Sequence, residues 1–200
     1  MDTDDADAIR FYFSFRSPYA WLAAERIEEE LGDLGVALDC IPVFPTPEQF
    51  PNDPSLLPQK VAYLAQDVRR IARKEGLTVT FPSQGDCDWL PSHAAALGAL
   101  RAGKGLELVR QLFRQRFQQG LDLGEDKVLA DASRRARCDP EATLAWAHDP
   151  DLRREVGDGW ARGVERDGIF GVPSFVVGRK LYWGQDRMAF VRQAARRKGP

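Results

Sequence analysis

A serine stands where a short apolar stretch gives way to a helical pattern, in the segment FYFSFRSPYAWL. Ser17 and Pro18 form the junction, and serine followed by proline is a common start of an α-helix. The first N–H groups of a helix lack partners within the helix, and the helix dipole adds partial positive charge there. Ser17 is therefore either an ordinary helix cap or a hydroxyl placed to stabilise a negative charge.

The cysteine pattern excludes dithiol chemistry at this junction. Transfer of electrons through a disulfide needs two sulfur atoms, and the segment from Ser17 to Ala20 contains none. Cys40, Cys87 and Cys138 are odd in number and widely spaced, without a CxxC or zinc-type pair. We expect no bound metal and a reducing compartment.

A second candidate feature is the Val172-Pro173 pair in GIFGVPSFVV. An X–Pro bond tolerates the cis form at about 0.5–1 kcal/mol, and proline at the first residue of a strand removes no ladder hydrogen bond. A cis bond here would leave the N–H and C=O of Val172 free to pair with an extended peptide ligand. The alternative is an ordinary proline that begins a strand.

A third feature is Gln185-Asp186 in WGQDRMAF, which we predict to open the last helix. Asp186 could simply complement the helix dipole in the first turn. Its carboxylate could also hold the ammonium group of a ligand, while nearby helix N–H groups hold the carboxylate of that ligand.

The elements around these residues are predicted to run β-α-β at the start and β-β-α at the end. Residues 9–15 and 36–44 are short and apolar, as buried strands are, with a helical pattern between them. SFVV, a GRK turn and LYW predict a hairpin before a final helix at 185–197. Between the two ends, after a proline-rich connection, helical periodicity predicts helices at 59–75, 91–102, 106–119, 125–137, 140–147 and 150–166.

This order of elements predicts an α/β protein with a thioredoxin fold, βαβ…ββα, interrupted by a large all-helical insertion. We expect residues 1–45 and 168–200 to form the thioredoxin-like domain and residues 46–167 the inserted helical domain.

Charge and hydropathy exclude other classes of protein. The formal net charge of −2 gives no overall basic field for nucleic acid or an anionic membrane. The start, MDTDDADAIR, lacks the pattern of a secretory signal, and no run approaches the roughly 18 apolar residues of a membrane span. We expect a cytoplasmic protein.

Taken together, the three features resemble the family of 2-hydroxychromene-2-carboxylate isomerases and kappa-class glutathione transferases, DsbA-like proteins with a helical insertion. The resemblance spans almost the whole chain and implies glutathione as cofactor, a small aromatic substrate and a possible homodimer. It implies that Ser17 contacts the glutathione sulfur, that Val172, before Pro173, pairs with the glutathione backbone, and that Gln185-Asp186 hold its γ-glutamyl end. A weaker match in FPNDPSLLPQKVAYLAQDV implies that Asn52 and Lys60 face glutathione or substrate.

The chemistry implied by the resemblance begins with a glutathione thiolate stabilised by Ser17. A thiol pKa near 8.5 leaves only a few per cent thiolate at neutral pH, so a shift of about two units downward would make the thiolate predominant. Addition to the double bond of an aromatic enone, rotation and departure of the thiolate would give isomerisation. Lys60 or Arg16 could supply positive charge to the developing enolate.

The sequence is also compatible with two other functions. A kappa-like glutathione transferase or peroxidase would use the same thiolate but consume glutathione. A non-catalytic DsbA-like module would bind extended peptide along the backbone at Val172-Pro173, and Ser17 would serve only as a helix cap. Arg16 and the pair Ser92-His93 depart from the family pattern, so we expect a different substrate pocket, and we expect His93 and His148 to be surface or helix residues rather than catalytic bases.

Overall fold

A computed structural model describes residues 8–51, 53–82 and 87–197 of the chain. Its centre is a four-stranded sheet with the strand order β2-β1-β3-β4. β1 (Ile9–Phe13) runs parallel to β2 (Leu38–Pro42) and antiparallel to β3 (Ser174–Val177), which forms a hairpin with β4 (Lys180–Trp183). Because the parallel pair requires a crossover, α1 (Pro18–Leu31) connects β1 to β2. The predicted thioredoxin fold is confirmed.

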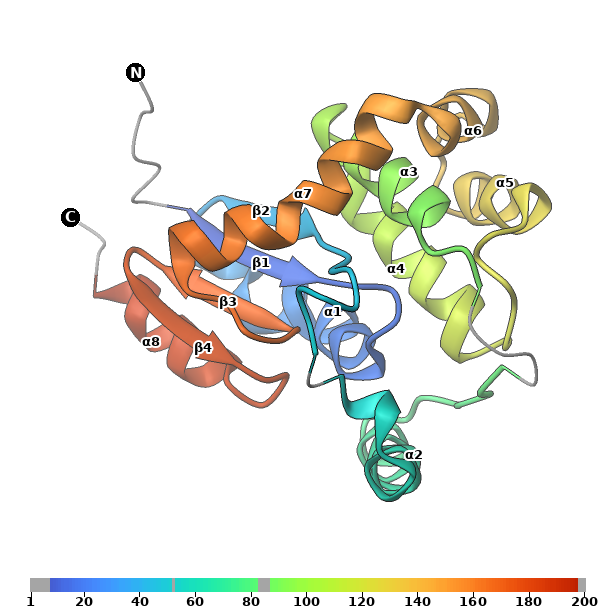
Figure 1. Ribbon diagram of the computed structural model, residues 1–200. Coiled ribbons are helices and arrows are strands. Elements are labelled where there is room, and N and C mark those ends of the chain that lie inside the picture. Colours follow the sequence, from blue (N-terminus) through green and yellow to red (C-terminus); the bar gives the residue numbers. More distant parts are fainter. Residues whose placement is uncertain (1–7, 52, 83–86, 198–200) are drawn as a thin grey trace.

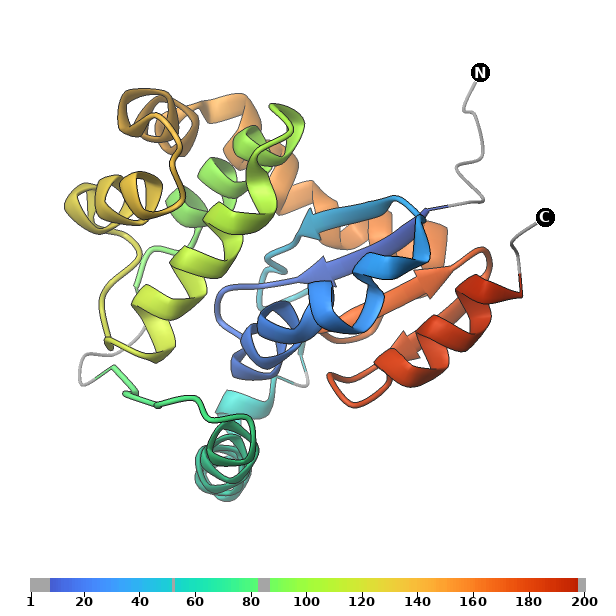
Figure 2. The ribbon, with the colours of Figure 1, turned by 180° about the vertical axis from the view of Figure 1, so that it is seen from behind.

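Helices cover both faces of the sheet (Figures 1 and 2). α1 and α8 (Met188–Arg196) lie on one face, and α7 (Pro150–Asp167) crosses the other. Side chains alternate accordingly along β1, because successive residues of a strand point to opposite faces. Phe11 and Phe13 are buried in the core beneath α1, whereas Tyr12 lies in a smaller cluster beneath α7.

The helices between the two ends of the sheet pack beside it (Figure 1). Their bounds agree with the sequence-based expectations to within two residues: α2 (Pro58–Lys74), α3 (Leu90–Arg101), α4 (Gly105–Phe117), α5 (Asp126–Arg135) and α6 (Pro140–His148). Two short 3₁₀ turns, η1 (Gly32–Leu34) and η2 (Pro54–Leu56), follow α1 and precede α2. α2 stands apart from the others and contacts α1. The division into two domains stays a prediction.

The last helix begins three residues later than predicted. α8 starts at Met188, with Arg187 as its N-cap residue, and not at Gln185. Gly184, just before, has a φ of 118°, a value that residues with a side chain rarely adopt. The chain therefore turns sharply after β4, and Gln185 and Asp186 lie in this turn instead of the first helical turn.

Gly98 allows α3 and α6 to approach closely. A methyl group at this position would lie 2.3 Å from Cγ of Trp146, so the indole or the helix would have to move. We expect Gly98→Ala to lower the free energy of unfolding by about 1–3 kcal/mol in urea titrations, although alanine is the better helix former. Gly157→Ala in α7 is the matched control, because nothing lies within 4 Å of its added carbon. A gain of stability in both variants would contradict this account.

Candidate active site

Ser17 caps α1 and also reaches the opposite loop. Its Oγ accepts a hydrogen bond from the N–H of Ala20 at 3.2 Å, which is the capping interaction expected from the sequence. The same hydroxyl donates its hydrogen to the carbonyl oxygen of Val172 at 3.3 Å. This second bond is long for an O–H donor, so the hydroxyl is weakly held and can turn to another acceptor. Ser17 is half-buried and remains accessible to a ligand.

The Val172-Pro173 peptide bond, which faces Ser17, is cis. The sequence-based interpretation expected a free carbonyl at Val172. In the structure this carbonyl accepts the hydrogen bond from Ser17. Its N–H has no hydrogen-bond partner among the described residues. The backbone of Val172 therefore offers a ligand one free N–H donor. Its carbonyl oxygen becomes a second contact point when the Ser17 hydroxyl turns away.

The first turn of α1 offers a second free donor. Pro18 has no N–H, and the N–H groups of Ala20 and Trp21 bond to the carbonyl oxygen of Ser17. The N–H of Tyr19 makes no hydrogen bond within the part of the chain that the structure describes. An anion placed beside Ser17 can therefore meet the Ser17 hydroxyl, the Tyr19 N–H and the positive end of the helix dipole.

Arg16 ties the proline-rich connection to this junction. Its guanidinium pairs with the carboxylate of Asp53 and donates to Oγ of Ser55 at 2.8 Å. Burial alone would raise the pKa of Asp53. The N–H of Ser55 and the charge of Arg16 nevertheless hold this pKa below its ordinary value. The positive charge that the sequence suggested for Arg16 is thus engaged in holding a loop. Asn52, the predicted ligand contact next to Asp53, lies outside the described residues.

Arg26 fixes the turn that carries Gln185 and Asp186. It donates to the backbone oxygen of Gln185 at 2.6 Å and to the side-chain Oε1 at 2.5 Å, and its guanidinium lies 3.6 Å from Glu75. Gln185 is therefore held against α1, on the same helix that Ser17 caps. Sequence reasoning missed Arg26, because it lies 159 residues from its partner.

Asp186 and Lys60 are more open than Gln185. The Asp186 side chain is 56% exposed and lies 3.4 Å from Arg187, and its charge reaches Tyr19 in the first turn of α1. Burial, with the hydrogen bond to Asp67 at 2.7 Å, raises the pKa of Tyr19, so this phenol stays neutral. Lys60 is exposed on α2, and the structure brings it into no contact with Ser17 or Val172.

His93, which we did not predict to be a functional residue, holds the loop between β1 and α1 in place. His93 on α3 is fully buried, and its Nδ1 lies 2.6 Å from the carbonyl oxygen of Trp89. Because a carbonyl only accepts, Nδ1 carries the hydrogen, and Nε2 accepts from the N–H of Phe15 at 3.1 Å and from the hydroxyl of Ser14 at 3.1 Å. Burial lowers the pKa of His93 to about 4, so the ring is neutral at pH 7. His93 thus positions the segment that ends in Ser17.

The structure places no metal-binding cluster of three or more His, Cys, Asp or Glu residues within residues 8–51, 53–82 and 87–197. The three cysteines are free thiols, and burial raises the pKa of Cys40 to about 12. Across the same described residues, no helix has both the length and the apolar character needed to cross a membrane.

A thioredoxin fold with serine at the start of its first helix, beside a cis-proline, defines a thioredoxin-like protein without a dithiol. The chain belongs to the family of DSBA-like thioredoxin domains, whose sequence profile matches residues 8–196. It is 26% identical over 191 residues to the 2-hydroxychromene-2-carboxylate isomerase of Sphingobium xenophagum, covering 92% of this chain and 95% of that protein. The enzyme of the same name from Pseudomonas putida is 24% identical over 194 residues, covering 93% of each chain.

A solved structure of 2-hydroxychromene-2-carboxylate isomerase superposes on this chain with a TM-score of 0.80 at 21% identity, covering 95% of both chains. At this level of identity the superposition establishes a shared fold.

Proposed function

We propose that this protein is a glutathione-dependent isomerase of the 2-hydroxychromene-2-carboxylate type, acting on a small aromatic substrate with a conjugated enone and a carboxylate. Relatives that match most of the chain are named 2-hydroxychromene-2-carboxylate isomerase, which supports the assignment of this protein as an enzyme of the isomerase class. The observation that carries the glutathione part of the proposal is the weakly held hydroxyl of Ser17 at the N-terminus of α1, opposite Val172.

Glutathione fits the donors and acceptors that surround Ser17. A thiolate beside Oγ would accept from the Ser17 hydroxyl and lie near the free Tyr19 N–H. The peptide part of glutathione would accept from the N–H of Val172, as an extended ligand does on a strand edge. The exposed carboxylate of Asp186 would bind the ammonium group of the γ-glutamyl end, next to Gln185, which Arg26 holds in place.

When bound, glutathione would supply a thiolate nucleophile for reversible addition to the conjugated double bond, which would permit rotation about the resulting single bond. Ser17 contributes by turning its hydroxyl from the Val172 carbonyl to the sulfur, which replaces a long bond by a charge-assisted one. The dipole of α1 acts in the same direction, because its positive end favours the charged form of the ligand. Lys60, exposed on α2, is the candidate cation for charge that develops on the substrate.

Thermal unfolding with glutathione tests the binding part of this proposal. At about ten times its Kd, glutathione should stabilise the folded protein by about 1.4 kcal/mol, which corresponds to roughly 3–6 °C for a chain of this size. We expect Asp186→Ala to lose most of this shift, whereas Asp158→Ala, an exposed aspartate on α7, keeps it.

Two further results would contradict the proposal. No shift at millimolar glutathione would leave the peptide-binding module as the better account. Consumption of glutathione during turnover would instead identify a transferase or peroxidase, because an isomerase leaves the total amount of glutathione unchanged.

A further inference from the structure

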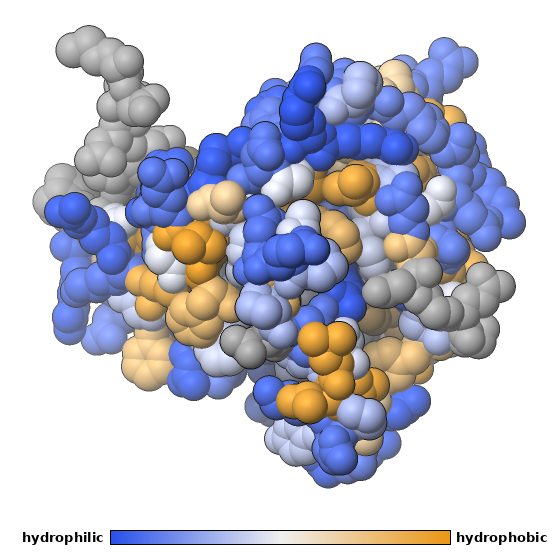
Figure 3. All heavy atoms as spheres, viewed as in Figure 1, coloured by the Kyte–Doolittle hydropathy of each residue, from blue (hydrophilic) through white to orange (hydrophobic). Residues whose placement is uncertain are grey.

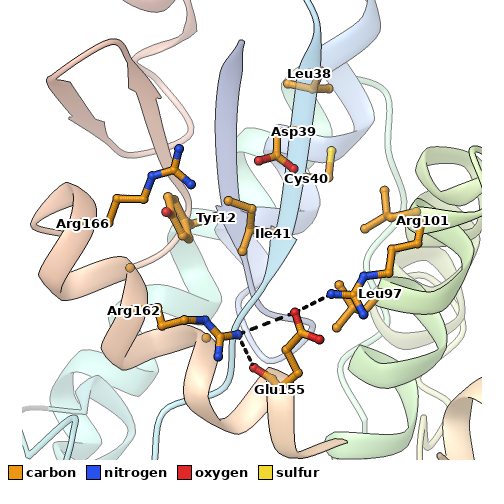
Figure 4. A pocket seen from close by; sticks show the side chains of 13 residues that line it. Tyr12, Leu38, Asp39, Cys40, Ile41, Leu97, Arg101, Glu155, Arg162 and Arg166 are labelled. Carbon is orange, nitrogen blue, oxygen red and sulfur yellow. Dashed lines mark hydrogen bonds and ion pairs between the residues drawn. The ribbon is translucent and has the colours of Figure 1, made fainter. Parts of the chain in front are cut away.

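A cavity lies along the edge strand β2 of the sheet. It has a volume of about 380 Å³, is open to solvent, and is lined by the edge strand β2, by α3 and by α7 (Figure 4). Tyr12 and Ile41, which face α7 and not α1, contribute to its wall. Leu38 and Cys40, which pack toward the core beneath α1, line it as well, so the cavity follows the edge of the sheet. Ser17 is not among its lining residues, and the cavity is distinct from the candidate active site.

The wall of the cavity is apolar on two sides. Leu38 and Ile41 come from β2, and Leu97 and Leu100 come from α3. On the α7 side, Gly159 and Gly163 line the cavity with backbone, and α7 packs closely there, since an added carbon at Gly163 would lie 2.6 Å from Cδ1 of Ile169. A hollow of this volume that combines apolar walls with charged groups is a plausible shape for a small organic anion.

Arginines dominate the rim of the cavity. Arg101 and Arg162 both bind Glu155, at 2.5 Å and 3.8 Å between side chains, and Arg162 also donates to the Glu155 backbone oxygen at 2.8 Å (Figure 4). Arg166 lies one turn further along α7, beside Tyr12, and is exposed. Its guanidinium has no hydrogen bond or ion pair with any residue that the structure describes.

The charges around the cavity do not cancel. Three guanidinium groups face two carboxylates, those of Glu155 and Asp39, which leaves one positive charge at the rim. Tyr12 cannot donate to a ligand, because its hydroxyl already donates to Asp167 at 2.6 Å. Within the described part of the chain Arg166 is thus the cavity arginine without an acidic partner, and a planar guanidinium matches a carboxylate with two parallel hydrogen bonds.

We infer that this cavity binds a small aromatic or aliphatic carboxylate with a single negative charge, its apolar body between β2 and α3 and its carboxylate on Arg166. The inference stands on the cavity alone and does not depend on the function proposed for Ser17. The apolar walls favour an organic anion over inorganic phosphate, which has no apolar part to bury.

Calorimetric titration of the full chain with 1-naphthoate, without glutathione, tests this site. We expect 1-naphthoate to bind, and the uncharged 1-naphthalenemethanol and inorganic phosphate to bind at least about tenfold more weakly. Arg166→Gln should weaken naphthoate binding at least about tenfold, whereas Arg179→Gln, an exposed arginine in the β3–β4 turn, should leave it unchanged. Ser17→Asp should also leave it unchanged, because Ser17 does not line the cavity.

The inference is overturned by absence of binding at about 10 mM naphthoate, or by equal affinity of the Arg166→Gln variant. It is equally overturned if Ser17→Asp abolishes binding, since the ligand would then occupy the candidate active site. Thermal unfolding of each variant verifies folding, and because Arg166 is exposed and unpaired among the described residues, its replacement should not lower the midpoint.

Discussion

Ser17→Ala is expected to lower the turnover of the isomerisation at least about tenfold, because removal of one positioned donor to a developing or bound anion commonly costs more than this. The variant should also raise the pH at which bound glutathione ionises, toward the ordinary thiol pKa near 8.5. Ultraviolet absorbance of the thiolate, measured against pH at saturating glutathione, reports the ionisation directly.

The capping role of Ser17 has to be separated from its role toward the ligand. Loss of the cap alone would destabilise the protein by about 1 kcal/mol, and a small change in unfolding does not decide between the two roles. Ser17→Asp is the sharper comparison, since aspartate caps a helix as well as serine but has no hydrogen to donate and carries a negative charge.

We expect Ser17→Asp to keep the free energy of unfolding and to lose turnover, and Ser17→Thr to keep most of both. If Ser17 were only a cap, the Asp variant would retain activity, and the thiolate titration of the Ala variant would match that of the unmodified protein. Either result would remove Ser17 from the mechanism.

His93→Leu is expected to lower the free energy of unfolding by about 3 kcal/mol, because it leaves the N–H of Phe15 and the hydroxyl of Ser14 without their buried acceptor. The same change should lower turnover, since the segment from Ser14 to Ser17 loses the contact that positions it. Urea unfolding and steady-state kinetics measure the two effects separately. His148→Leu is the matched control, because His148 is exposed. Its replacement should alter the free energy of unfolding and the turnover much less than His93→Leu does.

His93 should also make stability depend on pH in a defined window. Burial lowers its pKa in the folded protein to about 4, from 6.5 in the unfolded chain. Between these values the unfolded chain binds a proton that the folded protein does not, so stability is complete above pH 6.5 and is lost as the pH falls toward 4. The loss is on the order of 3 kcal/mol.

The pH window is tested by unfolding His93→Gln, whose side chain can still accept a hydrogen bond but does not titrate. Its free energy of unfolding should depend less steeply on pH between 6.5 and 4, by about one bound proton. An unchanged slope would mean that His93 is not the group that titrates. Carboxylates that titrate near the lower end of this window affect both proteins alike and cancel in the comparison.

The elements of the fold could be predicted from the sequence because their signals are local. The fully buried strand β1, the Ser17-Pro18 helix start and the periodic helices depend on neighbours within a few residues. The start of α8 was predicted wrongly because Gln185 and Asp186 look like a first helical turn. Only the contact of Arg26 with Gln185 in the folded chain shows that they form part of the preceding turn.

By itself the sequence determined the thioredoxin order of elements and the absence of a dithiol at Ser17, and it predicted three candidate segments for the site. The tertiary structure decided which groups are free there: the hydroxyl of Ser17 is weakly bound to Val172, Arg16 is engaged by Asp53, and His93 supports the junction from within the core. The physical reason is that hydrogen-bond partners such as Phe15 and His93, 78 residues apart, become neighbours only when the helical part packs against the sheet.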